Sequence, residues 1–364
     1  MSDNLYYLTS APFEAARKVE ILPVGHRARN LHGHSFLARM VTKCPNDSSE
    51  SAGDESFQVK DLFGRVVANL DYTLLNDLLD VPTDENLARW VRDRLSLPDI
   101  STIGIQSASD QGVDLDSRDN AHTWCRFRFE AAHKLPNVPP GHQCGRMHGH
   151  GFEVIIHAEE GLGSADLGID FDQIRQCWEP IQSLLHNSCL NEIEGLENPT
   201  SEMLSAWIWK RLKPILGSLS WVTVYETVTA GCHFDGSKYR IWKEFRFESA
   251  LQTDSNQDDS LGKLLLGHSY VTRLHLTAPL DNVMGWTVDY GDVKELFKPT
   301  YKKLDHHYLN DIENMGKGDL ESILRWMKSQ MSDSLPQLDR IDLYETPGCG
   351  AMLCWGDHGP ALPI

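Results

Sequence analysis

The order of apolar and polar positions along the chain predicts strands and helices in a sequence that recurs. In the middle of the chain, β-type segments at 125–131 and 152–158 come first, followed by stretches with helical periodicity and then by a late strand. The expected helices are Phe171–Leu185, 201–216 and Tyr290–Leu304, and the expected late strands are 221–227 and 340–346. The order β-β-α-α-β is typical of an α+β domain with an antiparallel sheet.

One frame of residues occurs three times in the chain. It begins Phe-Glu-small-Ala-X, and 15 residues after X comes the tripeptide X-Gly-His. The frames start at Phe13, Phe129 and Phe247 and lead to His32-Gly33-His34, His148-Gly149-His150 and Leu266-Gly267-His268. A period near 117 residues indicates repeated domains rather than a solenoid of small units. We expect the copies at about 1–115 (copy one), 120–243 (copy two) and 244–364 (copy three).

Three polar segments interrupt these patterns. Residues 46–56 are interpreted as a solvated insertion in copy one, 107–120 as the linker into copy two, and 252–260 as a loop within copy three.

Composition narrows the class of protein. The 364 residues are 41% hydrophobic, as in a globular protein, and no stretch approaches the roughly 18 uninterrupted apolar residues of a membrane span. The first residues carry no basic segment or apolar run, and the eight cysteines form no CxxC pair, so we expect a cytoplasmic protein with reduced thiols. The formal charge of −18 argues against a nucleic-acid partner but allows a small phosphorylated substrate.

Copy two carries a candidate metal site. On a strand, His148 and His150 point to the same face, and His133 supplies a third imidazole at the repeated spacing. Three nitrogen ligands with one open position are typical of a catalytic zinc, so we predict Zn²⁺ here. The alternative is a solvated turn or a packed pair of histidines.

The other copies lack parts of this ligand set. Arg17 replaces the first ligand in copy one, and Leu251 and Leu266 replace two of three in copy three. Neither a guanidinium nor a leucine can ligate a metal. Copy one keeps His32 and His34, so weak residual binding there stays open.

Cys144 lies four residues before His148. A divalent cation and Arg146 near this thiol favour its deprotonated form, the thiolate, which suits a base or nucleophile at neutral pH. The alternative is a buried, inert cysteine. We predict a catalytic role for Cys144.

Together these motifs resemble a known family. The pattern Cys-x-x-x-His-Gly-His, the upstream Phe-x-Ala-x-His-like strand, Asp-His before Leu-Asn, Pro-Thr-Ser-Glu and a late Tyr-Glu-Thr are similar to those of the 6-pyruvoyltetrahydropterin and 6-carboxytetrahydropterin synthases. The resemblance implies three tandem tunnelling-fold domains whose antiparallel sheets close a twelve-stranded barrel, with helices outside. It also implies that two barrels stack, here as a homodimer of chains.

The resemblance implies an acid–base pair just before Leu-Asn. Copy three has it as Asp305-His306, whereas copy two has His186 and Asn187 there, and copy one has Asp71 followed by Tyr72. In this family the active site lies between neighbouring domains. We therefore expect one composite site per chain, in which copy two supplies zinc and Cys144 and copy three supplies Asp305 and His306.

A late glutamate completes the implied site. It is Glu226 in copy two and Glu345 in copy three, and Gln106 stands at the matching place in copy one. The resemblance implies that this carboxylate binds the amino-pyrimidinone edge of a pterin. We expect Glu226 to be the residue that binds the substrate and Glu345 to be a vestige of a second such site.

The implied activity is a zinc-dependent lyase reaction on 7,8-dihydroneopterin triphosphate. The three-residue gap between Cys144 and His148 favours the 6-carboxytetrahydropterin branch over the 6-pyruvoyl branch. A repurposed enzyme with another substrate and a non-catalytic pterin-binding barrel are the alternatives.

Overall fold

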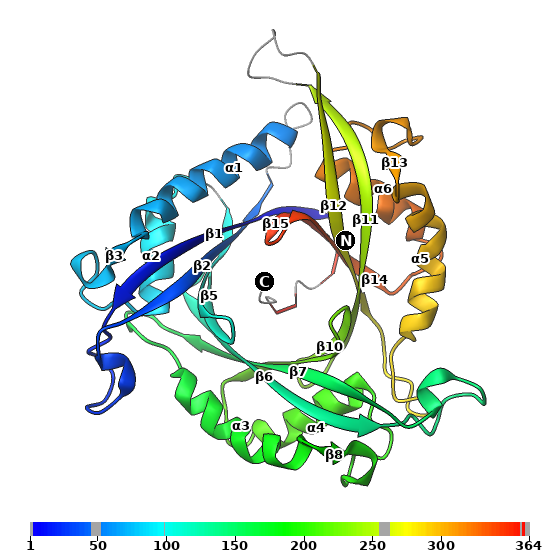
Figure 1. Ribbon diagram of the computed structural model, residues 1–364, viewed down its shortest axis with the longest axis horizontal. Helices are drawn as coiled ribbons and strands as arrows, with labels where there is room; N and C mark the ends of the chain where they lie inside the picture. The colour runs from blue at the N-terminus through cyan, green and yellow to red at the C-terminus, as the bar shows by residue number, and fades with distance from the viewer. Residues whose placement is uncertain (1–2, 45–51, 98, 255–262, 357–358, 361–364) are drawn as a thin grey trace.

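The computed structural model describes residues 3–44, 52–97, 99–254, 263–356 and 359–360. Twelve strands of this part form one closed antiparallel barrel (Figure 1). Their order is β10-β9-β7-β6-β5-β4-β2-β1-β15-β14-β12-β11, and the pairing of β10 with β11 closes the ring. The predicted closed barrel of twelve antiparallel strands is confirmed, with four strands from each copy.

Each copy contains two long strands, two helices and two shorter strands. Copy one contains β1 (Asn4–Arg17), β2 (His32–Lys43), α1 (Ala52–Val67), α2 (Asp84–Arg94), β4 (Ile100–Ala108) and β5 (Gln111–Asp116). Copy two contains β6 (Asn120–His133), β7 (His148–Gly161), α3 (Phe171–Leu185), α4 (Ser201–Leu212), β9 (Leu219–Thr227) and β10 (Ala230–Phe234). Copy three contains β11 (Tyr239–Asp254), β12 (Lys263–Thr277), α5 (Tyr290–Leu304), α6 (Leu320–Met331), β14 (Leu338–Thr346) and β15 (Cys349–Cys354).

The helices lie at the periphery of the ring, two beside the strands of each copy (Figure 1). Their apolar faces pack on the sheet and give each copy a large hydrophobic core of its own. Thr83 and Thr200 cap the N-termini of α2 and α4 by accepting a backbone N–H, which fixes where these helices begin. No helix in the described ranges is both long and apolar enough to cross a bilayer.

The segment expected to be a linker is part of the barrel. Within 107–120, β5 forms a hairpin with β4 and also pairs with β6. Its central residue, Asp114, is buried and bound to Arg39 at 2.6 Å between Oδ1 and Nη2. The prediction of a linker was wrong. Asp114 made the segment resemble a polar loop in the sequence, but its carboxylate is buried within a strand.

Three other boundaries differ from the expected ones. Helix α1 begins at Ala52, inside the segment expected to be an insertion, and residues 46–51 lie outside the described ranges. Strand β11 continues to Asp254 within the expected loop 252–260, of which 255–260 lie outside the described ranges. Helix α4 ends at Leu212 rather than at 216.

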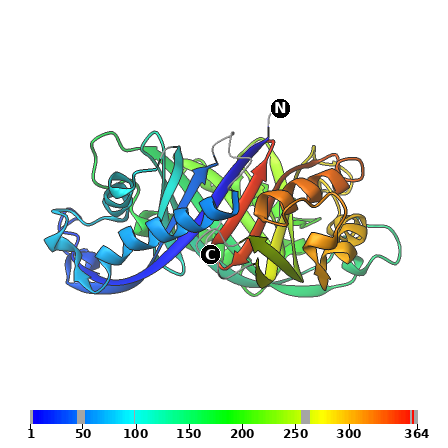
Figure 2. The same cartoon turned by 90° about the horizontal axis from the view of Figure 1, so that it is seen from above.

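Three equivalent strand ends share one end of the barrel. Neighbouring strands are antiparallel, and three strands separate β1 from β6 and β6 from β11 around the ring, so β1, β6 and β11 all run in the same direction. Position X of the repeated frame therefore lies at the same end of the barrel in all three copies, as Arg17, His133 and Leu251. We call this end the ligand rim. Figure 2 shows the barrel from the side, with β1 beside β15 and both inclined.

Candidate metal centre and its pocket

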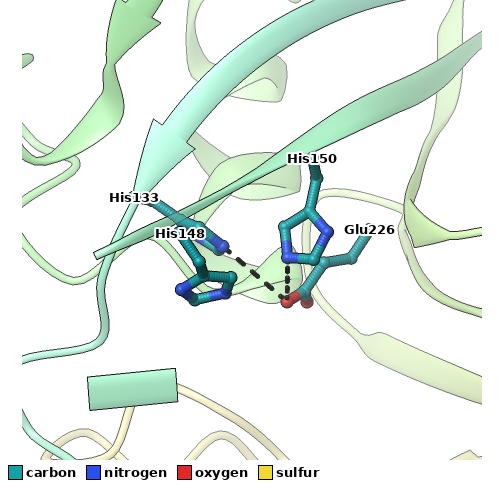
Figure 3. Close-up of side chains that lie close together, drawn as sticks. All are labelled: His133, His148, His150 and Glu226. Carbon is teal, nitrogen blue, oxygen red and sulfur yellow. Dashed lines mark ion pairs between the residues drawn. The ribbon is translucent and has the colours of Figure 1, made fainter. Parts of the chain in front are cut away.

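The three predicted ligands meet at the ligand rim. His133 ends β6 and pairs with His148, which begins β7, while His150 is two residues further along β7. The ring centroid of His133 lies 4.5 Å from that of His148 and 5.1 Å from that of His150. One atom from each imidazole and a carboxylate oxygen of Glu226 all lie within 4.8 Å of one another (Figure 3).

Hydrogen bonds leave the metal-facing nitrogens of this cluster free. The Nδ1–H of His133 donates to the carbonyl oxygen of Pro199 at 3.0 Å, and that of His148 donates to the carbonyl oxygen of Arg146 at 2.7 Å. Because a carbonyl can only accept, Nε2 of both rings carries the lone pair. The Nε2 atoms of His133 and His150 are buried without a hydrogen-bond partner.

Burial also favours the neutral form of two of these imidazoles. It lowers the pKa of His133 to about 4 and lowers the pKa of His150 as well. A metal ligand must present a free nitrogen lone pair, as the rings of His133 and His150 do, so the cluster fits a divalent cation.

Glu226, near the end of β9, adds a carboxylate to the cluster. Its Oε1 lies 3.6 Å from Nε2 of His150 and 4.0 Å from Nε2 of His133. Burial raises the pKa of Glu226 to about 7, and the nearby carboxylates of Glu202 and Asp289 add to this effect. The ionised form of Glu226 is therefore disfavoured unless a cation or a hydrogen-bond donor contacts the carboxylate.

Cys144 lies in the short 3-10 segment Gln143–Gly145 ahead of β7. Its backbone N–H donates to Nδ1 of His142 at 3.2 Å. Burial raises the pKa of the Cys144 thiol, and the charges of Glu226 and Asp289 raise it further. The protein's own groups therefore disfavour the thiolate, contrary to the effect expected from Arg146, and a bound cation is needed to reverse this.

The cluster opens into a pocket of about 640 Å³ between copies two and three. This volume lies within the range of small-molecule sites. The lining from copy two includes Cys144, Arg146, His148, His150, Glu202 and Glu226. The lining from copy three consists of Lys243 on β11 and of Trp286, Val288, Asp289, Tyr290 and Gly291.

Copy three is held against the pocket by polar contacts. Nε2 of His142 lies 3.3 Å from Oδ2 of Asp289, and the hydroxyls of Ser201 and Tyr290 are 2.9 Å apart. The buried carboxylate of Glu202 accepts hydrogen bonds from the N–H of Thr287 at 2.8 Å and from its hydroxyl at 3.1 Å. These contacts place the start of α5 at the pocket wall.

The sequence reasoning missed several of these pocket residues. His142, Glu202 and Asp289 were assigned no role, although Glu202 belongs to the Pro-Thr-Ser-Glu motif that carried the resemblance. A signal was present in the repeats, because His26 and Glu85 of copy one occupy the positions of His142 and Glu202 in copy two. The same residue type at the same position in two copies indicates a contact between neighbouring copies.

Asp305 and His306 do not reach this pocket within the chain. Tyr290, at the start of α5, lines the pocket, whereas Asp305 follows the last residue of the same helix. A helix of 15 residues is about 22 Å long. Asp305 accepts the backbone N–H of Glu248 at 3.0 Å, and its Oδ2 lies 3.0 Å from Nδ1 of His306, whose side chain is 77% exposed.

The equivalent sites of the other copies are filled differently. In copy one, Nη1 of Arg17 lies 2.6 Å from Oδ1 of Asp84, so a buried ion pair occupies the place of the metal cluster. In copy three, Leu251 is buried and Glu345 faces His268 at 4.0 Å. Burial raises the pKa of Glu345.

Comparison with known proteins agrees with this arrangement. The family model of 6-pyruvoyl tetrahydropterin synthase matches residues 8–102, 122–237 and 240–354. The 6-carboxy-5,6,7,8-tetrahydropterin synthase of Synechocystis sp. is 34% identical over 115 residues, which are 30% of this chain and 88% of that protein. The dihydroneopterin monophosphate aldolase of Pyrococcus furiosus is 29% identical over 111 residues, 29% of this chain and 92% of that protein.

Among solved structures, 6-pyruvoyl tetrahydropterin synthase of Caenorhabditis elegans covers 30% of this chain and 90% of its own, with 17% identity and a TM-score of 0.28. The three matches of the family model together span most of the 364 residues, and one match falls in each of the three four-stranded units of the barrel. The first match ends within β4, so β5 lies outside it. This chain belongs to the 6-pyruvoyl tetrahydropterin synthase family and contains three tandem copies of its domain.

Proposed function

We propose that the protein is a zinc-dependent lyase that acts on 7,8-dihydroneopterin triphosphate and releases 6-carboxytetrahydropterin. The observation that carries this proposal is the pocket between copies two and three. It brings three imidazoles, a thiol and a carboxylate together around a space that fits a small molecule.

The residues of the pocket have distinct roles in this proposal. His133, His148 and His150 hold Zn²⁺, which polarises oxygens of the substrate side chain when bound. Glu226 accepts hydrogen bonds from the amino-pyrimidinone edge of the pterin, which offsets the cost of burying its charge. Cys144 moves one proton at the substrate side chain, and Asp305 and His306 are proposed to move another.

Two cations of the pocket suit the anionic part of the substrate. Arg146 and Lys243 both line it, and the Nζ of Lys243 also donates to the hydroxyl of Thr229 at 3.0 Å. Burial lowers the pKa of Lys243, so an incoming phosphate would stabilise its charged form. We propose that these two side chains bind the triphosphate.

The choice of product is supported by the short Cys144-to-His148 gap and by the similarity to a 6-carboxytetrahydropterin synthase. The relative described as an aldolase supports a second candidate, a related reaction on another dihydroneopterin substrate. The 6-pyruvoyl branch and a pterin-binding barrel without catalysis remain further alternatives. We also propose a cytoplasmic location, because all eight cysteines lie in the described ranges and none forms a disulfide.

Mass spectrometry of the products tests the proposal. Purified protein loaded with zinc is incubated with 7,8-dihydroneopterin triphosphate, and the Cys144→Ala variant serves as control. Release of 6-carboxytetrahydropterin by the wild-type chain alone supports the proposal. A pyruvoyl product or a cleaved side chain without the carboxyl group assigns the chain to one of the alternatives, and unchanged substrate with bound zinc overturns the enzymatic role.

A further inference from the structure

The pocket between copies two and three contains a chain of three polar side chains that the roles proposed above do not use. The hydroxyl of Tyr290 lies 2.9 Å from that of Ser201, and Oγ of Ser201 lies 3.1 Å from Oε2 of Glu202. All three residues line the pocket. Ser201 and Glu202 begin α4 of copy two, whereas Tyr290 begins α5 of copy three, so the hydrogen bonds cross from one copy to the next.

The far end of this chain is a buried carboxyl group with one oxygen already occupied. Oε1 of Glu202 accepts hydrogen bonds from the N–H and the hydroxyl of Thr287, whereas Oε2 contacts Ser201. Burial raises the pKa of Glu202. The titratable groups that interact with its charge are Tyr290 of α5, Glu226 of β9, Cys232 of β10 and Tyr239 of β11. A proton on Glu202 therefore belongs on Oε2, facing the hydroxyl of Ser201.

The direction of the hydrogen bonds depends on whether Glu202 carries this proton. With Glu202 ionised, Ser201 donates to Oε2 and Tyr290 donates to Ser201, so the phenol oxygen offers only lone pairs to the pocket. With Glu202 protonated, it donates to Ser201, Ser201 donates to Tyr290, and the O–H of Tyr290 is free to donate into the pocket. One carboxyl proton thus decides whether Tyr290 accepts or donates a hydrogen bond there.

The glutamate by itself is explained by a structural role. At the seam between copies one and two, Glu85 takes the position of Glu202 and accepts the N–H of Gly168 at 2.9 Å. This contact matches that of Glu202 with the N–H of Thr287. A buried glutamate that holds the next copy is therefore common to both seams and does not indicate chemistry.

The two hydroxyls, in contrast, occur together only at the seam that has the metal cluster. Copy one has Asp84 and copy three has Leu320 at the position of Ser201, and copy two has Phe171 at the position of Tyr290. A glutamate that only joined two copies would need neither hydroxyl. Their position in the pocket that holds the three imidazoles is explained by a role in proton transfer.

We propose that Tyr290 delivers a proton to the substrate and that Glu202 supplies this proton through Ser201. We call these three residues the proton relay. This inference rests on the proposed function, and it adds a route for protons inside the pocket to the one that Cys144 provides. Tyr290 is the catalytic residue of the relay, whereas Ser201 and Glu202 act through it.

The transfer is balanced within the pocket. The O–H bond of Tyr290 breaks as its proton passes to the substrate atom on which negative charge develops, and the phenol oxygen takes the proton of Ser201. Ser201 takes the proton of Glu202, so the substrate gains one proton and Glu202 becomes a carboxylate. The N–H and hydroxyl of Thr287 stabilise this new charge. A proton that returns along the same path from the substrate or from water restores Glu202.

Infrared spectroscopy tests the relay without substrate. A protonated carboxyl group has a carbonyl stretch that depends on its hydrogen bonds, and the Glu202→Gln variant identifies the band of Glu202 by its absence. We expect Tyr290→Phe to shift this band, because neighbouring hydrogen bonds polarise one another. The band that is lost in Glu85→Gln is the control, and Tyr290→Phe should not shift it. If Glu202 has no such band at any pH at which the protein is folded, or if Tyr290→Phe leaves its band unshifted, the relay is overturned.

Kinetics test the proton transfer itself. Tyr290→Phe and Glu202→Gln should each lower kcat by about 100-fold with KM nearly unchanged, and both substitutions together should cost no more than either one. Phe171 shows that the fold accommodates phenylalanine at the position of Tyr290. Glu85→Gln is the matched control and should keep full turnover.

The kinetic outcomes separate the relay from the function on which it rests. Losses that multiply in the double variant, a loss confined to KM, or an equal loss in Glu85→Gln would each overturn the relay. A wild-type chain without turnover would overturn the proposed function instead, and the infrared band of Glu202 would still decide whether the relay exists.

Discussion

Copy one has the charged side chain of Arg17 at the position where copy two has the proposed metal ligand His133. The guanidinium of Arg17 lies over the ring of Phe36 at 5.0 Å and is bound to Asp84 and to the carbonyl oxygen of Pro82. Asp84 in turn accepts the hydroxyl of Ser107 at 2.7 Å. In copy one, a permanent cation thus occupies the place where we propose a bound cation in copy two.

Removing this cation is expected to destabilise the barrel. Arg17→Met leaves Asp84 buried without its partner, which costs about 3–5 kcal/mol. Urea denaturation measures the loss, and zinc content serves as the control because the metal cluster lies in copy two. Arg17→Met together with Asp84→Leu should recover much of the loss. Equal stability of Arg17→Met and wild type would show that the pair contributes nothing.

The two late glutamates are expected to differ in importance. Glu226→Gln should raise KM by about 10- to 100-fold, a loss of ~1–3 kcal/mol, because the amide nitrogen only donates and the side chain cannot accept a hydrogen bond from the pterin edge on each of its two terminal atoms. Bound zinc should remain stoichiometric. Glu345→Gln is the matched control, because Glu345 lies outside the pocket lining and should leave KM unchanged. If Glu345→Gln raised KM and Glu226→Gln did not, the substrate-binding carboxylate would be assigned to copy three.

Glu85 gives stability a pH dependence that can be isolated. Burial raises its pKa from 4.5 to about 7, so the folded chain holds this proton more tightly than the unfolded chain. Its stabilising effect is complete below about pH 4.5 and is lost as the pH rises to about 7. Glu85→Gln removes this loss, and the free energy of unfolding should favour the variant by up to ~3 kcal/mol at pH 7 relative to pH 4.5.

The equivalent glutamate of copy three supplies the control for this experiment. Glu321 is paired with Arg325 at 2.7 Å at the surface of α6. Glu321→Gln should therefore change the stability little, and its pH profile should follow that of the wild type. Parallel profiles for Glu85→Gln and wild type would contradict the argument.

At the scale of the element, the segment that carries Cys144 depends on one cross-copy contact. His142 holds the N–H of Cys144 with one ring nitrogen and approaches Asp289 at the start of α5 with the other. His142→Ala should lower kcat by about 10-fold and speed alkylation of the thiol, because Cys144 loses its fixed position. Zinc content should not change.

His26→Ala is the matched variant in copy one. His26 makes the same kind of contact, with Asp172 at the start of α3 at 3.2 Å, but no catalytic residue follows it, since Ala28 stands at the place of Cys144. This variant should lose some stability and keep full turnover. Loss of turnover in both variants would indicate a general effect on the barrel.

Local patterns predicted the elements that obey them. The bounds of α3 and α5 agree with prediction, since both have a regular apolar face and an aspartate cap. Strand β5 was missed because it is short and carries Asp114 on the face opposite Val113 and Leu115, where only the opposing Arg39 makes a buried carboxylate favourable. The partner lies 75 residues away, which no local pattern reveals.

The candidate site was likewise predicted only in part from the sequence. The cluster of His133, His148 and His150 followed from strand periodicity and from the repeat. The contribution of copy three came through Asp289 and Tyr290 at the start of α5, whereas the reasoning had placed Asp305 and His306 beside Cys144. Motif matching had brought Asp305 and His306 into the predicted site, but the length of α5 separates them from the pocket wall that its first residues form.

At the scale of the molecule, the three copies share one continuous sheet and are expected to unfold together. Each copy has two flanking seams, and an isolated copy two would expose both β6 and β10 as open edges. Urea denaturation should therefore give one transition, with coincident tryptophan fluorescence and circular dichroism. Resolved transitions for separate copies would show that the seams are weak.

The seam between β1 and β15 ties the timing of folding to protein synthesis. Asn4 pairs with Cys354, so the strand made first waits for the strand made last. At about 5–20 residues per second, translation of the chain between them takes tens of seconds, during which the edge of β1 has no partner. A nascent chain of this design is exposed to edge-to-edge aggregation for longer than a single-copy relative, and a chain truncated before β15 would form a barrel that cannot close between β1 and β14.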